Sequence, residues 1–393
     1  MIYLNNAATT WPKPDAVAEA MATTLHQSPP NAYRSTDNAA DTLGEVLRKR
    51  LATLLGIPHP NRIFLSSGAT DSLNRLLTGL PLAEKRILVT ATEHNSVLRP
   101  LWNHPQLRRQ TEVIPCDKYG KVHITAVEDM LKKSNNAKGG LLVVNHCSNV
   151  TGCIQEVASI CHLAHHYGML VLVDVSQSAG CTTVDAAGWD CDALVFTGHK
   201  SMLGPQGIGG YYLRPEIPLI PLLYGGTGRD SSRLTYEDGD YEYEVGTPNA
   251  PGMAGLLAAI DYIQGYGIER IKDKMRRLTH LLINELCSIN GVTVYSQECH
   301  VKNIITDLTD ERQGPVVSFN IHGLTASDAG YILANSYDII LRSGLHCSPL
   351  IHRYLGTAKG GTLRTSLSVM NTEEDVRALV DAVRELLVDD YRS

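Results

Sequence analysis

Seven short runs rich in Val, Leu and Ile, separated by segments with helical spacing, dominate the sequence between residues 62 and 213. Apolar strands that alternate with helices are typical of a largely parallel sheet with helices on both faces, so we expect an α/β fold. Ligands of such sheets bind at the carboxyl ends of the strands. The predicted strands are residues 62–66, 86–90, 112–115, 141–145, 169–174, 192–197 and 207–213.

Helical patterns lie between these runs. Residues 37–55 place a row of leucines on one face, and Gly56 follows where a helix would end. Residues 125–133 and 156–167 have similar spacing. These segments are the expected covers of the sheet.

The pattern changes after the last predicted strand. Residues 225–251 are rich in Gly, Thr and acidic residues, with Tyr236, Tyr241 and Tyr243 close together. A long irregular segment of this kind is usually functional or lies against a partner subunit.

A long helical stretch follows at residues 254–288, and we expect it to break near Gly265 and Gly267. The remaining sequence alternates strand and helix, and its last helix begins near residues 371–374. This part predicts a smaller α+β unit.

The composition excludes several classes of protein. The 35 Lys and Arg against 41 Asp and Glu give a net charge of -6, which disfavours nucleic-acid binding. No apolar run approaches the roughly 20 residues that span a membrane, and the first residues lack the features of a secretory signal. The nine cysteines never form C-x-x-C, so we expect no disulfide framework, no zinc ribbon and a reducing, cytoplasmic location.

A lysine and an aspartate close two successive predicted strands. Asp174 ends one strand, and Lys200 follows the next. A lysine at a strand end can form a Schiff base with pyridoxal 5′-phosphate, and a nearby carboxylate can hold the ring nitrogen of that cofactor protonated. Taken singly, both residues are also typical of solvated or ion-paired groups.

Other predicted strands are followed by small or polar residues. Residues 66–71 form a turn that could bind a phosphate at a helix N-terminus or simply cap that helix. His94 could stack on a planar cofactor or move protons, and Gln177 could contact the phenolic oxygen of the cofactor. A structural role is the alternative for both side chains.

These segments occur together in a characteristic order. They are residues 3–10 (YLNNAATT), 67–70 (SGAT), 93–96 (EHNS), 149–152 (NVTG), 174–177 (DVSQ), 197–200 (TGHK) and 246–249 (GTPN). With them, the chain resembles class V, fold-type I enzymes of the cysteine desulfurase family over nearly its whole length. We therefore expect a large cofactor-binding domain at 16–251, with a mostly parallel seven-stranded sheet, and a small α+β domain from 1–15 and 252–393.

The resemblance implies roles for individual residues. Lys200 would carry the cofactor as a Schiff base, Asp174 would pair with its pyridine nitrogen, and His94 would stack over its ring. Gln177 would contact the phenolic oxygen, and Asn149 would lie beside it and the substrate carboxylate. The implied phosphate contacts are Ala69, Thr70, Thr197 and His199.

Three further residues complete the implied site. Residues 341–349 (LRSGLHCSP) resemble the catalytic-cysteine loop of group II desulfurases, which makes Cys347 the acceptor thiol. Arg364 matches the arginine that binds the substrate carboxylate, for which a guanidinium fork is suited. A residue matching Thr247 reaches the cofactor phosphate of the other subunit, which implies a homodimer.

The expected activity converts L-cysteine to L-alanine and leaves a persulfide on Cys347 for an acceptor protein or small thiol. A selenocysteine lyase, a cysteine sulfinate desulfinase, a class V aminotransferase and a non-catalytic binding protein remain alternatives. Asn5 stands where the family often has Asp, which puts one supporting contact in question.

Two further groups of residues are assigned structural roles. The cluster of His162, His165 and His166 is expected to be a solvated helix face, and we expect no metal. The eight cysteines other than Cys347 are expected to be small buried hydrophobic residues.

Overall fold

The computed structural model describes residues 1–27, 42–133, 139–226, 232, 234–235, 243–296 and 312–389. Its main sheet has seven strands in the order β2-β8-β7-β6-β5-β3-β4, and the five strands β7-β6-β5-β3-β4 are parallel. All seven predicted strands and the expected α/β class are confirmed. The strands are β2 (Ile63–Ser66), β3 (Arg86–Thr90), β4 (Thr111–Ile114), β5 (Gly140–Asn145), β6 (Met169–Asp174), β7 (Ala193–Thr197) and β8 (Gly209–Leu213).

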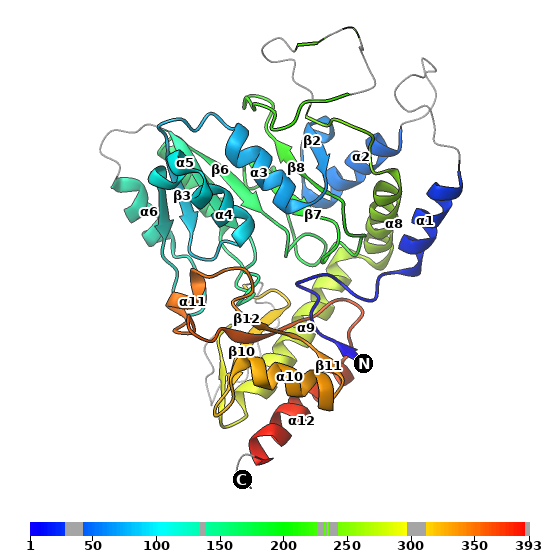
Figure 1. Ribbon diagram of the computed structural model, residues 1–393, viewed down its shortest axis with the longest axis vertical. Coiled ribbons are helices and arrows are strands. Elements are labelled where there is room, and N and C mark those ends of the chain that lie inside the picture. Colours follow the sequence, from blue (N-terminus) through cyan, green and yellow to red (C-terminus); the bar gives the residue numbers. More distant parts are fainter. Residues whose placement is uncertain are drawn as a thin grey trace.

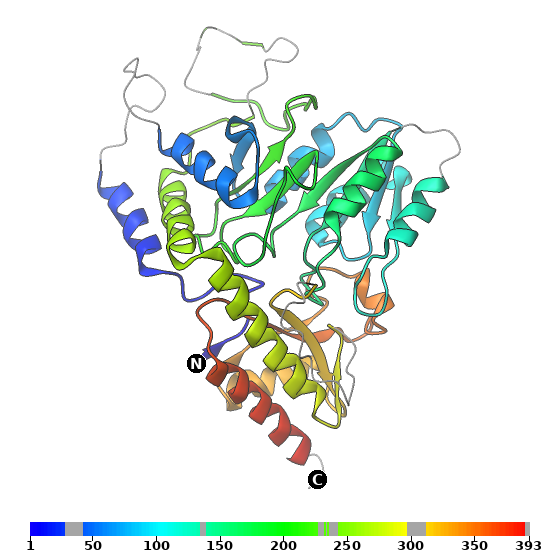
Figure 2. The ribbon, with the colours of Figure 1, turned by 180° about the vertical axis from the view of Figure 1, so that it is seen from behind.

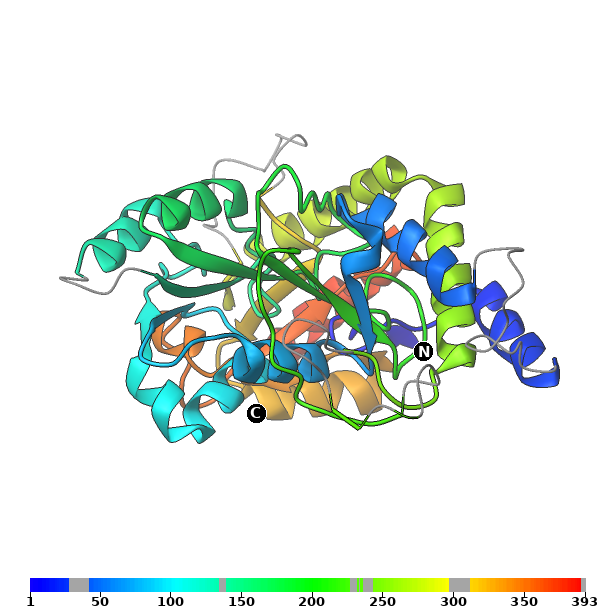
Figure 3. The ribbon, with the colours of Figure 1, turned by 90° about the horizontal axis from the view of Figure 1, so that it is seen from above.

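Helices cover both faces of this sheet (Figures 1–3). One face packs against α3 (Ala69–Gly79), α4 (Asn95–Asn103) and α5 (Pro105–Gln110). The other face packs against α2 (Leu43–Leu55), α6 (Ile124–Lys132), α7 (Val157–His166) and α8 (Ala250–Tyr266).

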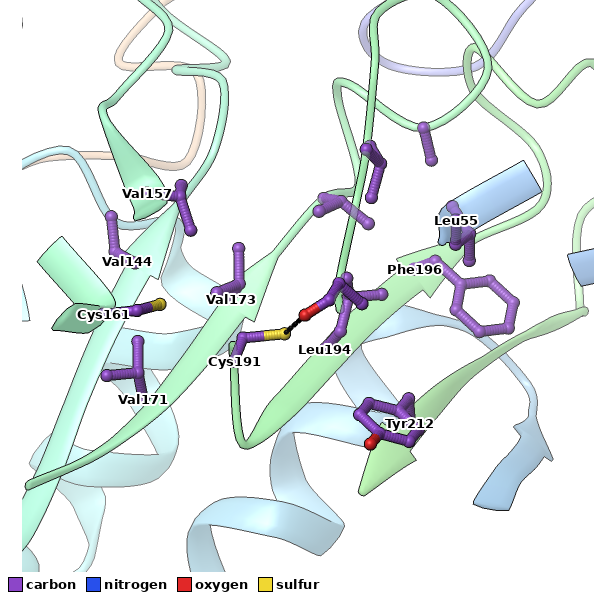
Figure 4. Close-up of a cluster of buried hydrophobic side chains, with 14 of the residues drawn as sticks. Leu55, Val144, Val157, Cys161, Val171, Val173, Cys191, Leu194, Phe196 and Tyr212 are labelled. Carbon is purple, nitrogen blue, oxygen red and sulfur yellow. Dashed lines mark hydrogen bonds between the residues drawn. The ribbon is translucent and has the colours of Figure 1, made fainter. Parts of the chain in front are cut away.

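Alternate residues of each strand point into opposite cores. In β6, Leu172 belongs to one core, whereas Val171 and Val173 belong to the other. Figure 4 shows the core that contains Val171 and Val173, where Cys161 of α7 lies against the sheet. Burial on both faces explains why the strands are continuously apolar.

A smaller unit lies below the carboxyl ends of the parallel strands (Figure 1). Its antiparallel sheet has the order β12-β13-β10-β9, and its core includes residues of α9, α10 and α12. The elements are α9 (Ile268–Cys287), β9 (Val292–Val294), β10 (Val316–Ile321), α10 (Ala326–Ser336), β12 (Arg342–Gly344), α11 (Ile351–Tyr354), β13 (Thr362–Ser366) and α12 (Glu373–Asp389).

The start of the chain joins this smaller unit. Strand β1 (Ile2–Tyr3) pairs in parallel with β11 (Ile339–Ile340), so the N-terminus lies beside the C-terminal elements (Figure 1). The chain then crosses to α1 (Asp15–His26), which packs on α8, and later passes a short 3₁₀ turn, η1 (Pro60–Arg62).

The predicted long helix is two helices, α8 and α9, separated at Gly267, whose φ is +92°. Helix α8 contributes Leu256 to the large core and Ile263 to the small one, so it packs with both units. The expected boundary between residues 251 and 252 stays a prediction.

The described parts of residues 225–249 form no helix or strand, and Tyr236 and Tyr241 lie outside the described residues. Within the described chain, every helix is too short or too polar to cross a bilayer.

Two adjacent glycines before β13 provide a test of the small unit. Gly361 has φ +71°, and a Cβ atom there would overlap the backbone of Gly344, whereas nothing lies within 4 Å of a Cβ at Gly360. We expect Gly361→Ala to cost about 2 kcal/mol or more and Gly360→Ala less than about 0.5 kcal/mol. Thermal unfolding of both variants tests this; equal losses of stability would contradict it.

Candidate functional site

The carboxyl ends of the parallel strands bring the predicted residues together at the edge that faces the smaller unit. Asp174 ends β6, Lys200 follows β7, and His94 follows β3. From the smaller unit, Arg364 of β13 and Cys347 lie close enough to Lys200 to affect its pKa. The structure therefore forms one cluster from both units.

Lys200 and Asp174 are the centre of this cluster. Burial lowers the pKa of Lys200 to about 8, with the nearby Asp174 carboxylate opposing that change and the Arg364 guanidinium adding to it. Asp174 is buried, and its Oδ1 accepts a hydrogen bond of 2.8 Å from the backbone N–H of Ser176. A lysine with a lowered pKa is available as a neutral nucleophile near physiological pH.

His94 caps α4 and has a defined protonation state. Its Nδ1 accepts a hydrogen bond of 3.0 Å from the backbone N–H of Ser96, and burial, followed by the charge of Lys200, lowers the pKa of His94 to about 3. The ring is therefore neutral, with its proton on Nε2. The Ser96 hydroxyl lies 2.8 Å from both His94 Nδ1 and Thr70 Oγ1, which ties His94 to the first turn of α3.

The turn before α3 is shaped to hold an anion. Gly68 caps this helix with φ +146°, and a Cβ there would lie 3.5 Å from Thr197 Oγ1. The first N–H groups of the 11-residue helix, beginning at Ala69 and Thr70, have no helical acceptor. Nearby in sequence, the buried Nδ1 of His199 has no hydrogen-bond partner within the described residues.

Arg364 and Arg342 form a pair of cations on neighbouring strands. They lie directly opposite each other in the β12–β13 register. Arg364 is only 1% exposed and donates to the backbone oxygen of Asn149 (3.0 Å) and to Asn5 Oδ1 (3.1 Å). Burial, assisted by Arg342, lowers the pKa of Arg364 to about 9. Neither guanidinium has a carboxylate partner within the described chain, so this pair would attract an anion.

The Cys347 loop lies against this pair. Arg342 Nη2 donates to Cys347 Sγ at 3.2 Å, and the backbone N–H of Asn95 donates to the carbonyl oxygen of Cys347 at 2.6 Å. Asn149 is hydrogen-bonded to residues on both sides of Cys347, His346 and Ser348. The thiol is half-buried and in contact with a fixed positive charge.

Two predicted residues lie differently from the rest. Gln177 is buried, and its Nε2 donates to the backbone oxygen of Ala7 at 3.0 Å, which leaves its side-chain oxygen for a further contact. Thr247 is exposed, and no described contact joins it to the cluster, so its contact with another subunit stays a prediction.

Sequence reasoning assigned no role to Glu93 or Arg342. Glu93 is fully buried, and its Oε1 accepts from Thr90 Oγ1 (2.6 Å) and the backbone N–H of Asn145 (2.8 Å). Burial raises the pKa of Glu93 to about 8; the Thr90 hydrogen bond opposes this change, and the Asp174 charge adds to it. Glu93 lies three residues after the end of the buried strand β3 and adjoins His94, and this position is the sequence feature that could have indicated its role.

Most of the other cysteines are buried as expected. Cys116, Cys147, Cys153, Cys161, Cys181 and Cys191 lie in the interior. The expectation is wrong for Cys287, which is half-buried and disulfide-bonded; Cys299 lies outside the described residues.

One residue of the histidine cluster on α7, His165, has a carboxylate partner. His165 Nε2 lies 2.8 Å from Asp192 Oδ2, so this histidine serves an ion pair or hydrogen bond. Among the described residues, no group of three or more His, Cys, Asp or Glu side chains is arranged to hold a metal ion.

Comparison with known proteins identifies the family. Residues 2–379 match the family described as Aminotransferase class-V. A probable cysteine desulfurase of Methanothermobacter thermautotrophicus is 31% identical, over 98% of this chain and 94% of that protein. A cysteine desulfurase of Cronobacter sakazakii is also 31% identical, over 97% of this chain and 92% of that protein. The apo structure of a cysteine desulfurase from Thermococcus onnurineus has a TM-score of 0.84 and 32% identity, and covers 98% of this chain and 94% of that one.

The chain belongs to the class-V aminotransferase family. Within that family, it belongs to the cysteine desulfurases, and its fold is the fold-type I architecture expected from the sequence. Assignment to group II stays a prediction.

Enzymes of this family use pyridoxal 5′-phosphate, and the described residues fit that cofactor. Lys200 supplies an amine with a lowered pKa, and Asp174 a buried carboxylate that could face a protonated ring nitrogen. The Gly68 turn and the unpartnered His199 Nδ1 supply donors for a phosphate.

The buried carboxyl of Glu93 predicts a distinctive pH dependence of stability. Because its pKa is raised to about 8, the folded protein holds a proton that the unfolded chain releases above about pH 4.5. The stabilisation is therefore complete below pH 4.5 and is lost as pH rises towards 8. We expect Glu93→Gln to become progressively more stable relative to the parent protein between pH 5 and pH 8, as measured by thermal unfolding.

Glu112→Gln is the matched control. A hydrogen bond from Arg86 lowers the pKa of Glu112, so its stabilisation is lost only as pH falls below the ordinary carboxyl range. The difference between this variant and the parent should stay constant from pH 5 to pH 8. The same constant difference for Glu93→Gln would show that Glu93 is ionised in the fold.

Proposed function

We propose that this protein is a pyridoxal 5′-phosphate-dependent L-cysteine desulfurase. The observation that carries the proposal is the meeting of a lysine amine, a carboxylate-binding arginine and a half-buried thiol in one cluster: Lys200, Arg364 and Cys347. The names of its relatives support the same activity.

The cofactor would be held by residues of the large unit. Lys200 would carry it, Asp174 would face its ring nitrogen, and His94 its ring. When bound, the cofactor supplies an electron sink for bonds broken at the substrate carbon next to the amino group. The remaining contacts would come from Ala69, Thr70, Thr197 and His199 for the phosphate, from Gln177 and Asn149 for the phenolic oxygen, and from Thr247 of the partner subunit.

Different residues of the chain carry out different steps of the reaction. Arg364 binds the substrate carboxylate, with Asn149 beside it, and Lys200 moves the proton at the substrate Cα. The neutral ring of His94, whose Nδ1 is engaged by the Ser96 N–H, would stack on the cofactor ring and assist Lys200 with its Nε2–H. The Cys347 sulfur attacks the substrate sulfur, so that an S–S bond forms while the bond between sulfur and Cβ breaks. The electron pair left on carbon takes up a proton, and alanine leaves.

The product is a persulfide on Cys347, which requires an acceptor protein or small thiol to remove it. A reduced Cys347 is needed for every turnover, so we place the enzyme in a reducing compartment, the cytoplasm. A homodimer is proposed because Thr247 is exposed and lies outside the cluster of its own chain.

Replacing the thiol tests the reaction directly. In a single turnover of the holoenzyme with L-cysteine, mass spectrometry should find one added sulfur on Cys347 as alanine appears. Cys347→Ala should form no persulfide while keeping the absorbance of the bound cofactor, because Cys347 is the nucleophile and not a cofactor ligand. Cys161→Ala is the matched control, since burial raises the pKa of Cys161 to about 12 and keeps it a thiol.

Other outcomes would separate the rival activities. Full sulfur release by Cys347→Ala would overturn the assignment of the nucleophile. Activity of that variant on selenocysteine but not cysteine would indicate a lyase, and conversion to pyridoxamine phosphate with an amino donor would indicate an aminotransferase.

The guanidinium of Arg364 gives a second test. Arg364→Lys keeps the charge but loses the fork that binds both carboxylate oxygens, so KM for L-cysteine should rise about 10-fold or more. Arg377→Lys, on the exposed face of α12, is the control and should leave KM unchanged. An unchanged KM in Arg364→Lys would exclude this arginine as the carboxylate ligand.

A further inference from the structure

The backbone of the Cys347 loop is strained at the reactive residue. His346 and Cys347 are both in the left-handed region, with φ of +51° and +61°. This region is unfavourable for residues with a Cβ, and two consecutive residues remain there only when surrounding contacts hold them. The contacts that hold this loop therefore decide where the sulfur lies.

One side chain contacts the loop on both sides of the thiol. Asn149 Nδ2 donates to the backbone oxygen of His346 at 2.7 Å, and Ser348 Oγ donates to Asn149 Oδ1 at 2.7 Å. Because a carbonyl oxygen only accepts hydrogen bonds, the amide nitrogen must face His346 and the amide oxygen must face Ser348. Ser348 is fully buried and Asn149 is 5% exposed, so water competes little for either bond.

We call the two hydrogen bonds of Asn149 with His346 and Ser348 the clamp. Other hydrogen bonds hold Asn149 itself in place. The Ser148 hydroxyl accepts hydrogen bonds of 3.2 Å from the backbone N–H groups of Val150 and Thr151, which sets the turn that carries Asn149. The backbone oxygen of Asn149 accepts from Arg364 at 3.0 Å. One residue thus connects the proposed substrate-carboxylate arginine with the loop of the nucleophile.

The other contacts of the loop do not duplicate this clamp. Asn95 and Arg342 contact the carbonyl oxygen and the sulfur of Cys347 itself. On either side of it, His346 Nε2 lies 3.0 Å from Thr362 O and 2.9 Å from Thr362 Oγ1, and the backbone N–H of Ser348 donates to Leu345 O at 2.9 Å. Each of these contacts acts on one neighbour only. Asn149 acts on those two neighbours, and the Ser348 hydroxyl satisfies the amide oxygen that would otherwise be buried without a donor.

We propose that Asn149 and Ser348 are positioning residues that hold the acceptor thiol of Cys347 in line with the substrate sulfur. This inference rests on the proposed desulfurase activity. It adds a second role to the cofactor and substrate contacts proposed for Asn149, because both polar ends of the amide also bond to the loop. Ser348 has no assigned contact with substrate or cofactor, so its effect is on the rate of persulfide formation and not on substrate binding.

Ser348→Ala tests the proposal in the holoenzyme. It removes the hydroxyl without touching Asn149, so the loop should loosen and the sulfur should lose its alignment. We expect single-turnover persulfide formation to fall roughly 10- to 100-fold, with KM for L-cysteine and the substrate-induced change in cofactor absorbance unaltered. Asn149→Asp, which replaces the donor facing His346 with an acceptor, should show a fall in rate at least as large.

Alkylation gives a readout that does not depend on the reaction. Without cysteine, iodoacetamide should modify Cys347 several-fold faster in Ser348→Ala than in the parent holoenzyme, as followed by mass spectrometry. Thr279→Ala is the matched control, because Thr279 is a buried residue whose hydroxyl donates to Met275 within α9, far along the chain from the loop. This control should change neither rate.

The possible results separate the two claims. Unchanged persulfide and alkylation rates in Ser348→Ala would overturn the clamp. A rise in KM with loss of the absorbance change would also overturn it, since the residues would then act on the substrate. If the parent enzyme forms no persulfide, the proposed function fails, and the alkylation rates still decide whether the clamp holds Cys347.

Discussion

Two guanidinium groups without carboxylate partners in the described chain add positive charge to the site. Arg342 and Arg364 face each other across β12 and β13, and Arg364 is almost fully buried. Their charges add to the effect of burial in lowering the pKa values of Lys200 and His94. A site that is positive in this way favours a neutral amine, a neutral imidazole and anionic ligands. The proposed chemistry needs the neutral amine, the neutral imidazole and the anionic ligands.

The site depends on contact between two separately packed units. The large sheet supplies Asp174 and Lys200 from its strand ends, whereas the smaller unit supplies Arg364 and Cys347 from an antiparallel sheet. The first residues of the chain join them, because Asn5 contacts Arg364 and Thr10 Oγ1 donates to the backbone oxygen of Lys200 at 2.7 Å. The position of the sulfur relative to the lysine is therefore set by long-range packing, and local helix or strand preferences have little influence on it.

That division explains what the sequence predicts and what it does not. The seven strands were predictable because burial on both faces makes each run apolar. Lys200, Asp174 and His94 were predictable because they follow such runs. The Ser348–Asn149 hydrogen bond spans 199 positions and leaves no local signal. Arg342 lies five positions before Cys347, but their contact follows from a turn with positive φ at Gly344, His346 and Cys347, which the residue types do not indicate. Cys287 was mistaken for a buried hydrophobic residue because a helical pattern does not report a disulfide.

Selectivity among the cysteines follows from the same electrostatics. Burial raises the pKa of Cys116, Cys161 and Cys181, to about 12, 12 and 11, so these side chains remain thiols and are poor nucleophiles. Cys347 contacts a guanidinium, through the 3.2 Å bond from Arg342. That contact places the Cys347 sulfur beside a fixed positive charge. Arg342, which faces the proposed carboxylate ligand Arg364, thus contacts the proposed nucleophile, so one pair of opposed cations borders both groups that must meet for sulfur to move.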